Sequence, residues 1–466
     1  MLPKIRRFLV SGYFLPLPLL FGLVGIFENQ QAKMISMILN VFLLTAVLFL
    51  SDDLLPALAP AFCTIIIGAT LLEILEVVIP YIPFAYPVVI ATVFHLIRYR
   101  KPLWVGSSFY GLIITSVAVL LSGIGTDIAT RDYSSLGAIY HLIGLSVGLI
   151  VLYLFFATNR KEERDFDPIH YFLMCLIVMG LLCAAVILEN FLEWSIQLSR
   201  GITVEGKETF SAFFNEIFYR NTISTLGVMC IPSAFYMAKR AKNAFEHIVF
   251  FFVGILIYVG AALTLARTAI LFGTLLLLIC LVYYFRGRRD IITKSMNLVL
   301  LLLFGAIFLY IFREAIAELL DFRLPKGWIS PTESRARLLL RSLEDFRAHP
   351  LFGIGITSLA NTDIYSAEGC ICWYHLYFPQ LWGSMGILGL VAYGIQLVIR
   401  AKLVFTKPDA QSIAMGLVYL GLFLYSQTDP GEFAPIPYAV LTVPLFMLLE
   451  GRARKLKKQS QKASER

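Results

Sequence analysis

Residues 168–190 read PIHYFLMCLIVMGLLCAAVILEN. From Pro168 to Leu188 this stretch contains no Asp, Glu, Lys or Arg. A helix needs about 20 apolar residues to cross the hydrocarbon core of a bilayer, so the run is long enough. Backbone inside lipid must satisfy its own hydrogen bonds, and a barrel would need short alternating strands instead. The run therefore predicts a membrane-spanning helix.

Similar apolar runs recur along all 466 residues, of which 58% are hydrophobic and 15% charged. Soluble domains are about 45–50% apolar and about 25% charged. The candidate spans are residues 8–27, 34–50, 54–79, 84–97, 103–122, 136–157, 168–190, 222–238, 245–264, 268–285, 296–312, 378–399, 411–427 and 437–450. We expect an all-α polytopic integral membrane protein with about 12–14 transmembrane helices. The proline-flanked pair 54–79 and 84–97 could instead form one re-entrant feature.

The basic residues predict the orientation of these spans. In a fourteen-span arrangement the clusters of Lys and Arg fall on the same side as the N-terminus, as the positive-inside rule requires of the cytoplasm. These clusters are Arg98/Arg100/Lys101, Arg160/Lys161/Arg164, Lys239/Arg240/Lys242, Arg286/Arg288/Arg289 and Arg400/Lys402/Lys407. The net charge of +8 therefore indicates topology, and we expect no nucleic-acid partner. We expect one polytopic membrane domain over residues 1–450, followed by a basic cytoplasmic tail over 451–466.

A large loop on the outer side, residues 313–377, carries structure of its own. Ser330, Pro331 and Glu333 have the types and spacing of a capping box, which predicts a helix from Ser330 to about Ala348. Pro350 would end it. Leu339, Leu343 and Phe346 form an apolar stripe at helical spacing.

Arginines on the outer side are the first candidates for function. Arg267 lies at the end of an apolar run, where it either binds a charged ligand or extends to the membrane surface. Arg335, Arg337 and Arg341 make the outer loop basic, and guanidinium groups bind phosphate through paired hydrogen bonds. The alternative is a solvated helix face whose arginines pair with neighbouring carboxylates.

His375 is the candidate for proton transfer, because imidazole accepts a proton near neutral pH. The alternative is a hydrogen-bonded histidine at the membrane interface. Asp429 and Glu432 in the last outer loop could bind sugar hydroxyls or cap helix ends.

The sequence contains no metal motif, no Gly-rich phosphate loop and no Gly-x-Ser-x-Gly elbow, so we expect no cofactor and no bound metal. A reaction on the outer face then needs a preactivated donor, such as a lipid-linked pyrophosphate.

Several of these residues together resemble the O-antigen ligase and O-antigen polymerase superfamily. That family shows an arginine, an amphipathic stretch and a His-Pro-Leu-x-Gly-x-Gly turn, then a catalytic histidine with a glycine eleven positions later. Here Arg335 lies fourteen residues before His349, which is followed by Pro350-Leu351-Phe352-Gly353-Ile354-Gly355, and His375 and Gly386 have the family spacing. Ala266-Arg267-Thr268 is similar to an upstream family arginine, although Ala266 replaces the usual serine. Tyr377 stands where many members have asparagine.

The resemblance implies an enzyme, a metal-independent membrane glycosyltransferase of the bacterial cytoplasmic (inner) membrane, with both termini cytoplasmic. It would transfer a glycan from undecaprenyl pyrophosphate to an acceptor hydroxyl for cell-surface polysaccharide biosynthesis. The acceptor would be lipid A-core for a ligase, as in lipopolysaccharide biosynthesis, or another lipid-linked repeat for a polymerase. Arg267 and Arg335 would bind the pyrophosphate, His375 would act as general base, and membrane lipids would surround the protein. The alternative outside this class is a transporter or flippase for an anionic or lipid-linked solute.

Overall fold

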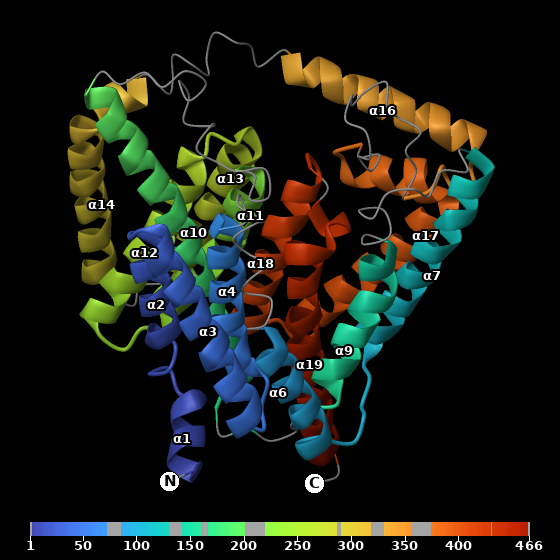
Figure 1. Ribbon diagram of the computed structural model, residues 1–466, viewed down its shortest axis with the longest axis horizontal. Coiled ribbons are helices and arrows are strands. Elements are labelled where there is room, and N and C mark those ends of the chain that lie inside the picture. Colours follow the sequence, from blue (N-terminus) through green and yellow to red (C-terminus); the bar gives the residue numbers. More distant parts are fainter. Residues whose placement is uncertain are drawn as a thin grey trace. The chain divides into compact units, whose positions relative to one another are not determined.

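The polypeptide folds into helices, and none of the residues described by the structure forms a strand. The computed structural model (Figure 1) describes residues 2–71, 85–129, 142–159, 164, 166–200, 220–286, 290–317, 330–356, 374–429 and 431–464. Within these residues, seven helices are long and apolar enough to cross a membrane: α3, α7, α10, α12, α13, α14 and α17. The predicted all-α polytopic membrane fold is therefore confirmed, while the number of spans stays a prediction.

The contacts divide the chain into two compact units. The first unit comprises residues 1–100 and 163–327, and the second comprises residues 101–162 and 328–466. The helices of the first unit are α1 (Leu2–Leu9), α2 (Pro16–Ile26), α3 (Gln30–Leu50), η1 (Leu55–Ala57), α4 (Leu58–Leu71), α6 (Ala85–Arg98), α10 (Pro168–Ser199), α11 (Arg220–Arg240), α12 (Ala244–Leu263), α13 (Arg267–Phe285) and α14 (Ile291–Ile311).

Helix α10, which contains the apolar stretch 168–190, forms the centre of the first unit. It begins after Asp167, whose carboxylate accepts hydrogen bonds from the first turn, and Pro168 fits the first helical position. It packs against α2, α4, α11 and α12. Helix α11 comes close because Gly180 has no side chain, and a Cβ there would lie 2.6 Å from the Cβ of Cys230. Small residues allow such close approach between membrane helices.

The second unit contains the predicted outer loop from residue 328 onward and the C-terminal helices. Its elements are α7 (Ser107–Ala129), η3 (Gly144–Gly148), α9 (Leu149–Ala157), α16 (Ser330–Ala348), α17 (Tyr377–Phe405), α18 (Ala410–Ser426), η5 (Gly431–Phe433), η6 (Pro435–Ala439) and α19 (Val440–Ser464). Helix α17 packs along α7, and α16 lies across the start of α17 (Figure 1). Helix α19 continues to Ser464, so residues 451–464 of the basic tail are helical.

Two helices, α10 and α17, end later than the sequence predicts. Helix α10 reaches Ser199, so residues 191–199 are helical instead of belonging to an outer loop. Buried Phe191 and Trp194 explain this extension, since they continue its packed face. Helix α17 ends at Phe405 instead of near residue 399. Helix α16 has the predicted range, but the side chains of its capping box lie outside the described residues.

Candidate functional site

His375 lies in the short turn that leads into α17. Its backbone has a φ of 51°, a left-handed conformation that few residues other than glycine adopt. Nδ1 of the imidazole lies 3.5 Å from Oδ1 of Asp429, and the two side chains are 26% and 17% exposed. The histidine is thus held beside a carboxylate while part of its ring stays open to solvent or a ligand.

Asp429 is itself fixed by the connection between α18 and η5. The hydroxyl of Tyr425 donates a hydrogen bond of 2.8 Å to Oδ2 of Asp429. The preceding residue, Thr428, accepts a hydrogen bond of 3.0 Å on its carbonyl oxygen from Nη2 of Arg335. Two neighbouring residues, Thr428 and Asp429, therefore contact Arg335 and His375. The structure brings these two predicted site residues to one short segment.

The sequence alone is consistent with two roles for Asp429, sugar binding and helix capping. Its contact with His375 joins residues 54 positions apart, so no local spacing rule connects them. The one local signal is Tyr425, four residues earlier on the last turn of α18. Asp429 lies beyond the end of α18 at Ser426, so the contact with Tyr425 depends on the turn that follows the helix.

Helix α16 is attached to the start of α17 by polar contacts. The buried hydroxyl of Tyr374 donates a 2.6 Å hydrogen bond to Oδ2 of Asp345, and Nε1 of Trp382 donates a 2.9 Å bond to Oγ of Ser342. The buried face of the helix is Leu338, Ser342 and Asp345. Leu339 of the apolar stripe is 37% exposed and lies outside this buried face.

The other two arginines of α16 differ in their surroundings. Arg341 lies with Nε 3.2 Å from Oδ1 of Asp345 and with Nη1 3.8 Å from Oε2 of Glu344. Arg337 is exposed on the helix surface. Carboxylates therefore offset the charge of Arg341, as in the alternative weighed for this helix, while Arg337 faces outward.

The turn that follows α16 pairs with α17 through its backbone. The N–H of Ile354 donates to the carbonyl of Gly383 at 2.9 Å, and the N–H of Ile387 donates to the carbonyl of Pro350 at 2.8 Å. These bonds resemble strand pairing, and they fall where α17 is interrupted at Gly386. The interruption frees backbone groups of α17 that a regular helix would use internally.

The glycines of this turn and of the α17 break are physically required. Gly353, Gly355 and Gly386 all have positive φ, at 64°, 93° and 62°. A Cβ on Gly386 would lie 2.5 Å from the carbonyl oxygen of Pro350, and one on Gly355 would overlap Thr126 of α7. The glycine spacing that carries the family resemblance thus describes two backbone segments in direct contact.

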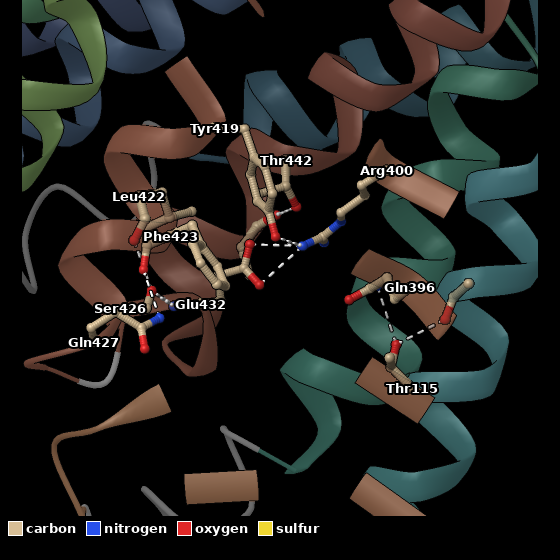
Figure 2. A network of polar contacts seen from close by, with 12 residues as sticks. Thr115, Gln396, Arg400, Tyr419, Leu422, Phe423, Ser426, Gln427, Glu432 and Thr442 are labelled. Atoms are coloured by element: carbon tan, nitrogen blue, oxygen red, sulfur yellow. Dashed lines mark hydrogen bonds and ion pairs between the residues drawn. The ribbon is translucent and has the colours of Figure 1, made fainter. Parts of the chain in front are cut away.

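A buried ion pair joins α17 to η5, the element that follows Asp429. Figure 2 shows this pair. Nη1 of Arg400 donates to Oε1 and Oε2 of Glu432 at 2.7 and 2.9 Å and to the hydroxyl of Tyr419 at 2.7 Å. The guanidinium lies 4.9 Å from the ring centroid of Phe446. The side chains of Arg400 and Glu432 are 7% and 4% exposed. The prediction that Arg400 belongs to a basic connection between spans is therefore wrong. Arg400 lies within α17, and Glu432 supplies its counter-charge inside the second unit.

Tyr377, which stands where many members of the resembled family have asparagine, is fully buried. Its ring lies 5.3 Å from the rings of Phe423 and Phe433. Its hydroxyl is buried and has no hydrogen-bond partner among the described residues. The residue therefore acts mainly as packing between α17 and the segment that contains Glu432.

Arg267 belongs to the first unit and begins α13. Leu265, with a φ of 55°, forms the sharp turn after α12, and Ala266 offers no side-chain cap to the first turn of α13. The start of a helix favours a negative charge nearby. That Arg267 binds an anion, and that it lies near His375, both stay predictions.

Comparison with known proteins gave no match. No protein-family model matches the chain, and no curated protein matches it. Within the described residues, no three His, Cys, Asp or Glu side chains come together as metal ligands. Cys370 and Cys372 of the large loop, as well as Glu73 and Glu76, lie outside the described residues.

Proposed function

We propose that this membrane protein transfers a glycan from a lipid-linked pyrophosphate to an acceptor hydroxyl. The observation that carries the proposal is the contact of His375 with Asp429, next to the residue that holds Arg335. A base, its orienting carboxylate and a cation are the groups that such a transfer needs. The resemblance in sequence supports undecaprenyl pyrophosphate as the donor carrier and lipid A-core or another lipid-linked repeat as the acceptor.

In this mechanism His375 acts through the nitrogen that does not face Asp429. The carboxylate would hold the proton of Nδ1, leaving Nε2 to take the proton of the acceptor hydroxyl. The acceptor oxygen then bonds to the anomeric carbon of the donor sugar as the bond from that carbon to the pyrophosphate breaks. The imidazolium formed is stabilised by Asp429.

The leaving group gains negative charge as that bond breaks, and cations would stabilise it. Arg335 presents a guanidinium beside Thr428, with one nitrogen bound to the backbone and further donors on the same group. Arg267 is the second predicted pyrophosphate ligand, and it is the first residue of α13. Arg337 and Arg341 remain predicted helpers, and the charge of Arg341 is already shared with Asp345.

The test uses purified protein in lipid, an undecaprenyl-pyrophosphate glycan and candidate acceptors. We expect His375→Asn to lower transfer by about 10²–10⁴-fold, the usual contribution of a general base. Asparagine is chosen because it tolerates the left-handed backbone of this position better than alanine. Asp429→Asn should lower transfer while leaving the donor KM nearly unchanged. Exposed His170 is the control, and His170→Asn should retain activity.

A transporter or flippase is the second candidate, and the buried Arg400–Glu432 pair favours it. Ionisable residues inside membrane domains commonly line transport pathways. Vectorial movement of the lipid-linked glycan, unaffected by His375→Asn and without transfer to any acceptor, would support transport and reject the enzyme.

A further inference from the structure

A cavity of about 740 Å³ opens at the end of the second unit where the basic tail begins. Four cationic side chains line it, those of Lys407, Arg454, Lys457 and Lys458. Such a concentration of positive charge around one hollow favours an anionic ligand. No step of the proposed transfer uses these residues.

One wall of the cavity is a turn that is fixed in position. Lys407 has a φ of 47°, a left-handed conformation that is rare for a side chain of its size. The guanidinium of Arg452 holds this turn, since it binds the carbonyls of Thr406 and Lys407 and lies 3.0 Å from Oδ2 of Asp409. Residues are held in such conformations where the surrounding structure requires them, often at ligand sites.

A second part of the cavity lining, around Glu450, is held by hydrogen bonds. Buried Glu450 accepts hydrogen bonds from the hydroxyls of Ser108 and Tyr153, at 2.6 and 2.8 Å. Gly106 leaves room for that carboxylate, because a Cβ there would overlap it. The lining thus combines the four cations with a carboxylate whose oxygens are already hydrogen-bonded.

The aromatic and apolar residues at the edge of the cavity favour one class of anionic ligand. Arg454 lies over the ring of Trp104, 4.6 Å from its centroid, and tryptophan is enriched where protein meets lipid headgroups. Leu103 and Phe405, the chain neighbours of lining residues, are 54% and 70% exposed. A ligand with a phosphate and an apolar tail would satisfy both the cations and this apolar border.

We propose that this cavity binds the phosphate headgroup of an anionic membrane lipid. The site is independent of the glycan-transfer proposal, because none of its residues belongs to the group around His375. It would tie the end of α19 to the turn between α17 and α18 through the lipid.

The test is a titration of purified protein in neutral detergent with phosphatidylglycerol, phosphatidylcholine or inorganic phosphate, followed by native mass spectrometry. We expect phosphatidylglycerol to bind more tightly than phosphatidylcholine. The pair Lys407→Gln/Arg454→Gln should weaken that binding by about tenfold or more. The matched pair Lys455→Gln/Lys462→Gln removes the same charge from exposed positions outside the cavity and should change the affinity little.

Equal weakening by both pairs, or equal binding of the two lipids, would overturn the proposal. Saturation of the same site by inorganic phosphate at the same concentrations would assign it to a soluble phosphate compound instead of a lipid. Because Arg454 packs on Trp104, melting curves without lipid must match the wild type. If they do not, exposed Lys457→Gln replaces the pair, and unchanged phosphatidylglycerol affinity in that variant would also reject the site.

Discussion

Arg400 and Glu432 form an ion pair in which one guanidinium nitrogen lies 2.7 and 2.9 Å from the two carboxylate oxygens. The N–H of Glu432 also donates to Oγ of Ser426 at 3.2 Å. This pair anchors one end of the connection whose other end contacts Arg335 and His375. A buried pair of this kind costs desolvation, so its value lies as much in fixing one arrangement as in stability.

Breaking this pair on one side should destabilise the second unit. Arg400→Met or Glu432→Leu alone leaves an unpaired buried charge, and each should cost about 3–5 kcal/mol. The double variant Arg400→Met/Glu432→Leu should cost less than either single change, because no buried charge remains. Thermal unfolding in detergent, arranged as a double-mutant cycle, measures the coupling. Additive losses would mean that the two side chains act independently.

Arg335 and Arg337 allow a matched comparison on one helix. Arg335→Gln should raise the donor KM and lower transfer, because it removes a cation beside the His375 group. Arg337→Gln removes the same charge two residues away from an exposed position and should have the smaller effect. Steady-state kinetics with varied donor separate the two. Equal effects would indicate that α16 acts through its overall charge instead of through Arg335.

Gly386 should not tolerate a side chain. Its φ and ψ of 62° and −153° are accessible almost only to glycine, and a Cβ would contact the backbone of Leu351 and Pro350. Gly386→Ala should therefore cost more than the about 1–3 kcal/mol of backbone strain alone. Gly394→Ala is the control on the same helix, since its Cβ would meet nothing within 4 Å. That change should be neutral or stabilising, and a reversed order of melting temperatures would contradict the backbone contact.

Asp409 should make stability depend on pH at the start of α18. Partial burial opposes ionisation, but the N–H of Ser412 and the guanidinium of Arg452 outweigh it and lower the pKa of Asp409. A lowered folded-state pKa gives stabilisation that is complete above the unfolded pKa and is lost as pH falls through the folded pKa.

Asp409→Asn keeps the helix cap and removes the charge. Near neutral pH it should cost about 0.2–1 kcal/mol, as an exposed ion pair does. The difference from the wild type should vanish in acid. Asp409→Ala also removes the cap and should cost about 0.5–2 kcal/mol even in acid. Melting curves between neutral and acidic pH check both, and a difference of Asp409→Asn that persists in acid would rule out the ion pair as its source.

The sequence predicted much of the secondary structure because the signals are local. Apolar runs such as 168–190 become helices, since backbone in lipid has no other hydrogen-bond partners. Pro350 and the pattern before it placed the end of α16 at Ala348. The ends of α10 and α17 were missed, because burial of Phe191 and pairing of Arg400 come from other helices.

The arrangement of the candidate site was decided by the tertiary structure. The sequence by itself selected His375 and Arg335 and the spacing of the glycines. It could not show that Thr428 contacts Arg335 while its neighbour Asp429 contacts His375. Nor could it show that Glu432, 32 residues further along the chain, pairs with Arg400. Helical periodicity determines which side chains share a face, whereas the partner of a buried charge depends on which segments pack together.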